Sequence, residues 1–265
     1  MVAVLGVLTS CGSSPPDALN TTPEAVGHHF IATVTDVVDG DTLIVDRDGR
    51  EEVVRLLGIN APEVDECLHE GATGYLTDIL SGRTVGVEDH GTDRFGRGLA
   101  YLWLGDSLVN EGVAARGLAI ATTPDDGDPL GASIVSAEEA AAAEGLGLWA
   151  EDVCGAAGTS SGVRVDSAIS FDPPGPDEEA LEEEWVRFGS ARVVDAGGWA
   201  VRDESSANRC LLPPGSLIAP NRSLTVTSAD SCWGPDPSPV WNNEGDIVLL
   251  LDDSGRFVAW SRYTD

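Results

Sequence analysis

Acidic and basic side chains suited to catalysis gather in two short stretches of the chain, 38–63 and 93–101. The first stretch carries Asp39, Asp41, Arg55 and Glu63, and the second carries Arg97. Arginine binds two oxygens of a phosphate through its planar fork and stays charged at any working pH. Aspartate offers a hard oxygen ligand for calcium or magnesium, and a further carboxylate can take a proton from water. These residue types therefore predict metal-assisted chemistry on a phosphate ester.

The strands and turns expected around these residues would hold them at the mouth of a small sheet. Three segments, 30–38, 42–48 and 52–59, alternate apolar and polar residues, and Asp-Gly turns at 39–40 and 48–49 separate them. This pattern predicts a three-stranded meander. The first turn would place Asp41 where the second strand begins.

Further elements are expected to complete a barrel with three helices. Apolar residues at helical spacing predict a helix over 66–80, and Ser107 offers an N-cap for a second helix that ends at Gly117. Two more strands are expected at 84–88 and 99–104, and an alanine-rich helix at 132–144. Five strands with inserted and appended helices predict an α+β OB-fold barrel, whose curved face commonly binds oligonucleotides. Trp149 is expected to pack the last segment onto this barrel.

Five motifs in this region resemble the staphylococcal nuclease (thermonuclease) family. They are DGDT at 39–42, RLLGINAPE at 55–63, DRFGRGLAY at 93–101, LVNEGVAARGLA at 108–119 and GLGLW at 145–149. The order and approximate spacing are those of the family over residues 30–155. One motif alone is a weak signal, because Asp-Gly turns and an ion-paired Arg55 also occur without catalysis. Five motifs in register favour the nuclease interpretation.

The resemblance implies a calcium-dependent nuclease and assigns roles to single residues. Arg55 and Arg97 match two arginines that clamp the phosphate, and Glu63 matches the glutamate usually assigned as general base. Asp41 matches a calcium ligand. Ala61 stands where a threonine binds the metal through its backbone carbonyl, so the changed side chain need not matter.

Three departures from the family pattern concern the metal and the nucleotide. Asn60 replaces a second calcium-binding aspartate, and because calcium affinity depends on ligand charge we expect weaker metal binding. Phe95 replaces a tyrosine that contacts the nucleotide, and we assign it to substrate binding together with Arg94. Tyrosines expected beyond the second helix are replaced around 122–125, so we expect less base stacking there.

The overall charge excludes tight, non-enzymatic binding to nucleic acid. Lys and Arg together number 15 against 45 Asp and Glu, which gives a formal net charge of -30. Affinity for the phosphate backbone normally comes from basic patches, so this chain repels nucleic acid at long range. A bound cation and a few arginines would have to provide the local positive field.

A second domain is expected after a Gly/Ser-rich linker at 156–162. Residues 163–265 show short strands at close intervals with Gly, Pro and Asp turns, which predicts a β-sandwich. The order of EWVRF, GGWAVRD, LPPGSLIAPNRSLTV and WNNEGDIVLLLDDSGRFVAW resembles the lamin-tail domain, an immunoglobulin-like module. In bacteria that domain is often attached to secreted or surface nucleases. The acidic run at 176–184 is expected to be a solvated loop.

Cysteine usage favours an oxidising compartment. Four cysteines, Cys67, Cys154, Cys210 and Cys232, suit disulfides, and pairing within each domain is the simplest of the three connectivities. Cys11 ends LTSC at 8–11, which resembles a bacterial lipobox in which the cysteine is lipidated. Residues 1–29 would then be a signal remnant and a flexible tether. The alternative is an ordinary apolar N-terminus with an accidental cysteine.

The sequence thus predicts an extracellular or cell-surface lipoprotein anchored to the bacterial membrane. Its nuclease domain would hydrolyse single-stranded or frayed DNA and RNA with low sequence specificity, using Ca2+ as cofactor. The C-terminal domain would serve as an adhesion or spacer module with an unknown surface partner. The alternative is a catalytically weakened nuclease fold that acts as a surface binding module.

Overall fold

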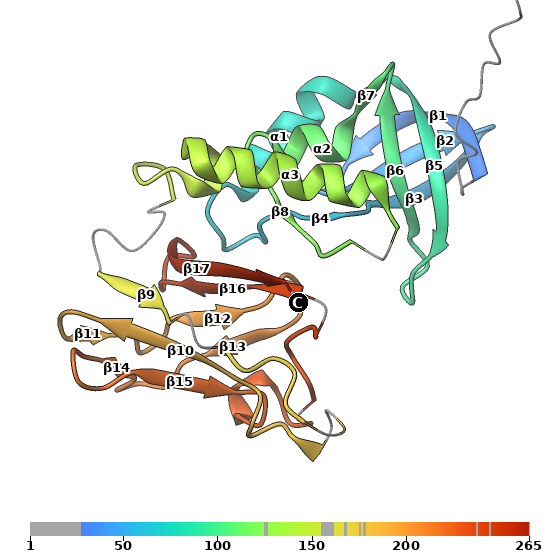
Figure 1. The fold of residues 1–265 in the computed structure, drawn as a ribbon. Helices are drawn as coiled ribbons and strands as arrows, with labels where there is room; N and C mark the ends of the chain where they lie inside the picture. Colours follow the sequence, from blue (N-terminus) through green and yellow to red (C-terminus); the bar gives the residue numbers. More distant parts are fainter. Residues whose placement is uncertain are drawn as a thin grey trace, which may run out of the picture.

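The computed structural model describes residues 28–264 except 125–126, 155–161, 167–168, 175, 177–178, 237 and 244. Figure 1 shows a part with three helices and a barrel packed against an all-β part that follows it in the chain. Among the described residues, no helix has the length and apolar character needed to cross a membrane. The expected lipidation site at Cys11, the tether 1–27 and linker residues 156–161 lie outside the described residues and stay predictions.

Five strands form the closed barrel that the sequence predicts. Their order is β3-β2-β1-β5-β6, and a parallel pairing of β3 with β6 closes the ring. The strands are β1 (His28–Val37), β2 (Thr42–Arg47), β3 (Arg50–Leu56), β5 (Thr84–Thr92) and β6 (Gly98–Leu104). With the three helices, this barrel fits an OB-fold.

Alternating apolar side chains fill the interior of the barrel. Successive strand residues point to opposite faces, so one apolar residue in two reaches the core. Val34, Leu43, Val45 and Leu102 are fully buried there. Burying a side chain of this size contributes about 1.5–3 kcal/mol, which is why the period-two pattern fixes the register.

The helices begin at different residues from those predicted. The first, α1 (His69–Leu80), starts three residues late, because Leu68 adopts a left-handed conformation with φ of 67°. The second, α2 (Val109–Ala114), is short, and Ser107 is not its cap. Ser107 instead belongs to β7 (Ser107–Leu108), which pairs with the end of β6.

The third helix, α3 (Pro129–Glu144), starts before the predicted alanine run. Asp128 caps it, accepting the N–H of Leu130 at 3.0 Å and of Gly131 at 3.1 Å, and proline occupies the first helical position. An aspartate N-cap followed by proline is a strong start signal that the alanine content obscured. One pair of short strands and one 3-10 turn complete this part: β4 (Ile59–Asn60) with β8 (Ile120–Ala121), and η1 (Gly147–Trp149).

The C-terminal part is all-β among the described residues, as predicted, and contains three sheets. One has the order β15-β10-β9, one joins β11 to β14, and one has the order β13-β12-β16-β17. The strands are β9 (Val163–Val165), β10 (Trp185–Ser190), β11 (Val194–Asp195), β12 (Ala200–Arg202), β13 (Arg209–Leu211), β14 (Leu217–Ile218), β15 (Leu224–Thr227), β16 (Gly245–Leu251) and β17 (Phe257–Thr264), with a 3-10 turn η3 (Ser231–Trp233) before β16. An immunoglobulin-like arrangement of these sheets stays a prediction.

Disulfides join the cysteines within each part, which confirms the simplest of the predicted pairings. Cys67 pairs with Cys154 across 87 residues of sequence, and Cys210 pairs with Cys232 across 22. Such bonds stabilise a chain mainly by restricting its unfolded state, and they persist in oxidising compartments.

An apolar cluster joins the two parts, and Trp149 belongs to it. Its ring centroid lies 4.6 Å from that of Trp260 and 5.6 Å from that of Phe257, both on β17. Ile247 and Leu249 of β16 pack in the same cluster. Trp149 therefore packs against the C-terminal sheet and shares its cluster with Ile120 and Ala141 of the nuclease part, so the prediction named only one of its two sets of neighbours.

The acidic run before β10 is not wholly solvated. Glu184 is buried, and its carboxylate accepts the N–H of Trp241 at 3.0 Å and of Val240 at 3.4 Å. These bonds tie the run to the segment before β16, so the prediction of a solvated loop is wrong for this residue.

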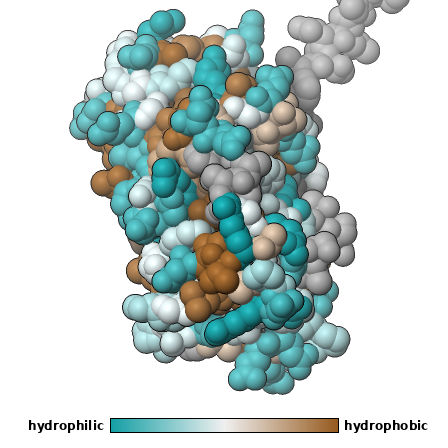
Figure 2. All heavy atoms as spheres, turned by 90° about the vertical axis from the view of Figure 1, so that its left-hand side faces the viewer, coloured by the Kyte–Doolittle hydropathy of each residue, from teal (hydrophilic) through white to brown (hydrophobic). Residues whose placement is uncertain are grey.

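The face of the molecule shown in Figure 2 is mainly hydrophilic, as the charge excess predicts.

Buried carboxylates gather at the start of β16. Asp246 accepts the N–H of Ile247 at 2.7 Å and of Glu204 at 3.0 Å. Burial, followed by the neighbouring carboxylates of Asp203 and Glu204, raises the pKa of Asp246 from 3.8 to about 8. Burial likewise raises the pKa of Asp203 to about 7.

This cluster should make stability fall as pH rises from about 5 to about 8. In that range the folded protein holds a proton on Asp246 that the unfolded chain, with an ordinary aspartate pKa, has lost. We expect a loss on the order of 2–4 kcal/mol in the free energy of unfolding, measured by urea titration at several pH values. Asp246→Asn keeps an oxygen for the two N–H groups and should flatten the slope; an unchanged slope would contradict the assignment to Asp246.

Candidate functional site

A tight turn places Asp41 at the start of β2, as the sequence predicts. The carboxylate of Asp39 accepts the N–H of Asp41 at 3.0 Å and of Thr42 at 2.7 Å. Gly40 lies close to α1, since a Cβ at this position would be 2.5 Å from the Cβ of Ala72 and 2.7 Å from that of Ala61. Only glycine allows so close an approach, and the turn is therefore held in one place.

Arg55 joins the predicted metal ligands into one hydrogen-bonded cluster. Its Nη1 lies 3.1 Å from Oδ2 of Asp41 and donates to the carbonyl of Ile59 at 2.9 Å, and its Nη2 donates to Oδ1 of Asn60 at 2.8 Å. Oδ2 of Asp41 also accepts the N–H of Ala61 at 2.7 Å. Four residues that the sequence singled out thus meet: Asp41, Arg55, Asn60 and Ala61.

The environment of Asp41 is short of positive charge. Burial raises the pKa of this carboxyl to about 6, and Arg55 offsets part of the rise. A buried carboxylate costs free energy unless a cation or hydrogen-bond donors face it. In the structure Arg55, the N–H of Ala61 and the hydroxyl of Thr42 face this carboxylate.

The donor atoms suit calcium in kind. Asp41 contributes a carboxylate, Asn60 an amide oxygen and Ala61 a backbone carbonyl, and all three are the hard oxygens that calcium prefers. Within the described ranges there is no group of three His, Cys, Asp or Glu side chains arranged around a metal position. The donor types are compatible with calcium, and Asp41 would be the single carboxylate of such a site; in the structure Arg55 contacts both Asp41 and Asn60.

Asn60 also bonds to the C-terminal part, which sequence reasoning missed. Its Nδ2 donates to the backbone carbonyl of Glu204 at 2.9 Å. An ionised aspartate has no N–H to make this bond. The contact gives a structural reason for asparagine at a position where the family commonly has aspartate.

Glu63 lies two residues beyond Ala61 and is exposed. Its backbone N–H donates to Oε2 of Glu66 at 3.1 Å. No hydrogen bond or ion pair with a described residue ties its carboxylate to the Asp41 cluster. The side chain is therefore free to meet water and substrate.

The turn between β5 and β6 carries Arg94, Phe95 and Arg97. Asp93 fixes this turn by accepting the N–H of Phe95 at 2.8 Å, the N–H of Arg97 at 2.9 Å and the Nε–H of Arg97 at 2.7 Å. Phe95 is 68% exposed, and the guanidinium carbons of Arg94 and Arg97 lie 4.8 Å and 5.5 Å from its ring centroid. The turn presents an aromatic face and two cations to solvent.

The pairing of β3 with β6 brings this turn toward the Asp41 cluster. Arg55 is opposite Leu99, two residues after Arg97, in the parallel register. The Arg97 side chain itself contacts Asp93, and among the described residues no ion pair links it to the cluster. The structure thus brings Arg55 together with the metal ligands and leaves Glu63 and Arg97 on neighbouring, more exposed segments.

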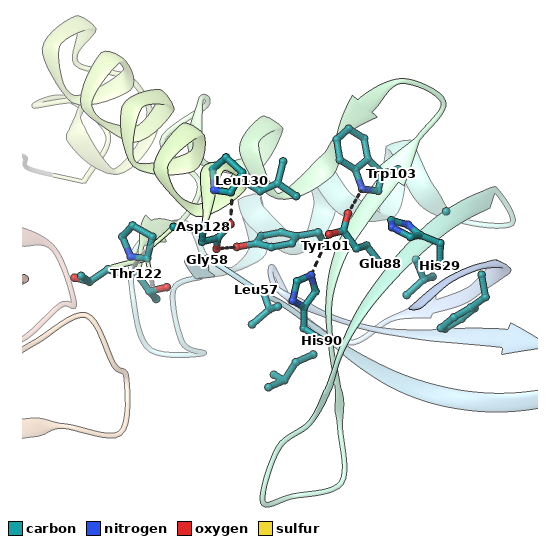
Figure 3. A pocket seen from close by; sticks show the side chains of 18 of the residues that line it. His29, Leu57, Gly58, Glu88, His90, Tyr101, Trp103, Thr122, Asp128 and Leu130 are labelled. Carbon is teal, nitrogen blue, oxygen red and sulfur yellow. Dashed lines mark hydrogen bonds and ion pairs between the residues drawn. The ribbon is translucent and has the colours of Figure 1, made fainter. Parts of the chain in front are cut away.

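A hollow of about 1320 Å³ lies beside Leu57 and Leu99 (Figure 3). Its polar side chains are mostly paired with one another: Tyr101 with Asp128, and both His90 and Trp103 with Glu88. Thr122 and Thr123 line one end, where the family has tyrosines, and Asp125 lies outside the described residues. Thr122 and Thr123 thus offer no aromatic ring that could stack on a base.

Comparison with known proteins finds similarity to nucleases. Residues 53–151 match the family described as staphylococcal nuclease homologue. A thermonuclease of Staphylococcus intermedius is 35% identical over 121 residues, which are 43% of this chain and 72% of the relative. A thermonuclease of Staphylococcus hyicus is 38% identical over 91 residues, 31% of this chain and 54% of the relative.

A third relative comes from another genus. An uncharacterized endonuclease of Haemophilus influenzae is 32% identical over 120 residues, 45% of this chain and 66% of the relative. The family match includes Arg55, Asn60 and Ala61 of the hydrogen-bonded cluster, and Asp41 precedes it. With this cluster, the closed five-stranded barrel and these similarities, the chain belongs to the staphylococcal nuclease homologue family.

Proposed function

We propose that this chain is a calcium-dependent nuclease that hydrolyses phosphodiester bonds in single-stranded or frayed DNA and RNA with low sequence specificity. Family membership supports the enzyme class of a phosphodiester-hydrolysing nuclease. The observation that carries the proposal is the cluster of Asp41, Arg55 and Asn60, in which a guanidinium and hard oxygen ligands meet at the rim of the barrel.

In the proposed reaction Glu63 takes a proton from water, and the water oxygen attacks phosphorus. The bond from phosphorus to the leaving oxygen of the sugar breaks in line with the attack, and that oxygen takes a proton from solvent water. Arg55 and Arg97 bind the non-bridging oxygens, where negative charge increases in the transition state. Calcium, held by Asp41, Asn60 and the carbonyl of Ala61, would supply further positive charge beside that phosphate.

Substrate selection would rest on few contacts. Phe95 offers an exposed ring for a base, and Arg94 adds a cation beside it. Stacking on an aromatic ring tolerates any base, because every base has a π-face. The net charge of -30 weakens binding at long range, so we expect a high KM. Salt screens this repulsion, so the KM should rise less with salt than the KM of basic nucleases does.

We also propose an extracellular or cell-surface location, with Cys11 lipidated and anchored in a bacterial membrane. The disulfides support an oxidising compartment. In this proposal the lamin-tail-like C-terminal domain is an immunoglobulin-like adhesion or spacer module for a surface partner. Its all-β composition is what supports the assignment.

The alternative is a weakened nuclease fold that serves as a surface binding module. The asparagine at position 60, the threonines at 122 and 123 and the strong negative charge favour it. The two functions differ in turnover, since a binding module would hold a strand without cutting it.

Removal of calcium should separate these two functions. We expect the protein to cleave denatured DNA in millimolar calcium and to lose nearly all activity in excess chelator, because Asp41 then lacks the cation that faces the phosphate. Readdition of calcium restores the activity, and magnesium serves as the control ion. Cleavage that is equally fast in chelator would contradict the calcium site, and no cleavage in either buffer would favour the binding module.

A further inference from the structure

Residues 60–67 form a short segment that carries Asn60, Ala61 and Glu63, and the C-terminal part holds both of its ends. Asn60 donates to the carbonyl of Glu204, and the N–H of Cys67 donates to the carbonyl of Gly255 at 3.2 Å. The turn at Gly255 packs so closely that a Cβ there would lie 2.3 Å from the carbonyl oxygen of Asp65. The segment is therefore clamped between the barrel and the C-terminal sheets.

Glu66 is the central residue of this clamp. Its side chain is 2% exposed, and both carboxylate oxygens accept from Nη1 of Arg202, at 2.6 Å and 2.7 Å. Nη1 of Arg209 lies 3.3 Å from Glu66 and 3.5 Å from Asp65. Two arginines from neighbouring strands of the C-terminal sheet, β12 and β13, thus hold one carboxylate of the nuclease part.

The clamped carboxylate in turn fixes the backbone of Glu63. Oε2 of Glu66 accepts the N–H of Glu63 at 3.1 Å, and the N–H of Glu66 donates to the carbonyl of Glu63 at 2.8 Å. These reciprocal bonds close a turn of four residues. A chain of direct contacts therefore runs from Arg202 through Glu66 to the residue proposed as general base.

The buried ion pair of Arg202 and Glu66 adds little net stability to the contact between the two parts, so we assign it a geometric role. The Arg202 side chain is 0% exposed, and burying two charges costs several kcal/mol before they attract each other. Apolar residues of similar volume would often stabilise such a contact equally well. A charged hydrogen-bonded contact, in which Nη1 of Arg202 meets both oxygens of Glu66, depends on direction and distance more than an apolar contact does.

We propose that Arg202 and Arg209 are positioning residues for the nuclease reaction: through Glu66 they hold Glu63 at the place from which it takes the proton of water. The inference rests on the proposed function. In this proposal the C-terminal sheets help to position the general base and also act as a spacer. Because a displacement of about 1 Å can cost a hundredfold in rate, a loose segment would turn over slowly even with every catalytic group present.

The test uses full-length variants that keep the fold. Arg202→Lys preserves the charge but removes the planar guanidinium, whose Nη1 meets both oxygens of Glu66 while its Nε donates to the carbonyl of Asp203, and should lower kcat about tenfold with KM nearly unchanged. Arg209→Ala removes the second cation and should lower kcat about threefold. Arg187→Ala is the matched control, because Arg187 is a half-buried arginine on β10 that contacts Trp185 and Thr225. This variant should leave activity unchanged.

A second comparison separates positioning from general damage. In a Glu63→Gln background, Arg202→Lys should cause no further loss of kcat, because the group that it positions is already gone. A tenfold loss in that background as well would overturn the proposal. If Arg202→Lys does not fold, Arg209→Ala carries the same comparison.

Failure of the inference can be told apart from failure of the proposed function. Unchanged kcat in both arginine variants of an active enzyme overturns the inference alone, whereas an inactive unmutated protein overturns the proposed function. Amide hydrogen exchange at Glu63 gives a readout that needs no activity. The N–H should exchange faster in Arg202→Lys than in Arg187→Ala, and equal rates would show that no clamp acts on this residue.

Discussion

Replacing Glu63 with glutamine is expected to lower kcat for cleavage of denatured DNA by about 10²–10⁴-fold, the range typical for loss of a general base. The amide cannot take the proton of the attacking water, although its size and hydrogen-bonding shape are nearly the same. The side chain is exposed and bonded to no described residue, so the free energy of unfolding should stay within about 0.5 kcal/mol of the unmutated value. Initial rates in saturating calcium measure the effect.

The control for Glu63→Gln is Glu70→Gln. Glu70 is an exposed carboxylate in the first turn of α1, and its replacement changes the net charge by the same amount. We expect this variant to keep full activity. Equal rates for Glu63→Gln and the unmutated protein would show that another group takes the proton.

Replacing Arg97 with alanine is expected to lower kcat by about 10²–10³-fold, as does the loss of one donor to a transition-state oxyanion. Arg97 is the more exposed of the two proposed clamping arginines, and Asp93 is its only ion-pair partner among the described residues. The turn should survive, because Asp93 still accepts the backbone N–H of residue 97 and of Phe95. A surface ion pair contributes about 0–1 kcal/mol, so stability should change little.

Arg50→Ala and Arg97→Lys are the controls that separate the effect of charge from the effect of the guanidinium shape on kcat. Arg50 is an exposed arginine at the turn after β2, and its removal lowers the net charge equally, so it shows how much of the effect is long-range field. Arg97→Lys keeps the charge and loses the planar fork, and should recover only part of the rate. A raised KM with unchanged kcat in Arg97→Ala would mean that this residue binds substrate equally well before and during the reaction.

Local sequence patterns were sufficient to predict the barrel and the centre of the site. The alternation over 30–59 set the faces of the strands, and Asp39 and Gly40 specified the turn that presents Asp41. Helix starts were less well predicted, because competing signals lay close together. Ser107 has the character of a cap, yet pairing with β6 prevailed, and Asp128 with Pro129 outweighed the alanine run.

Long-range contacts could not be predicted from the sequence. Asn60 and Glu204 are 144 residues apart, and Glu66 and Arg202 are 136 apart. No local pattern distinguishes a glutamate that will be buried against an arginine from one that stays in solvent. Glu184 was misassigned, and the contact of Trp149 with the C-terminal sheet was missed, for the same reason, since these partners lie before β16 and on β17.

The buried pair of Glu66 and Arg202 also constrains how such a protein can evolve. If recombination replaced the C-terminal half with a foreign module, Glu66 would remain as an uncompensated buried charge, which typically costs about 3–5 kcal/mol. Mesophilic domains have a total stability of only about 5–15 kcal/mol, so most such hybrids would be poorly folded from the start. We therefore expect an exchange of the C-terminal half to succeed only when residue 66 changes at the same time.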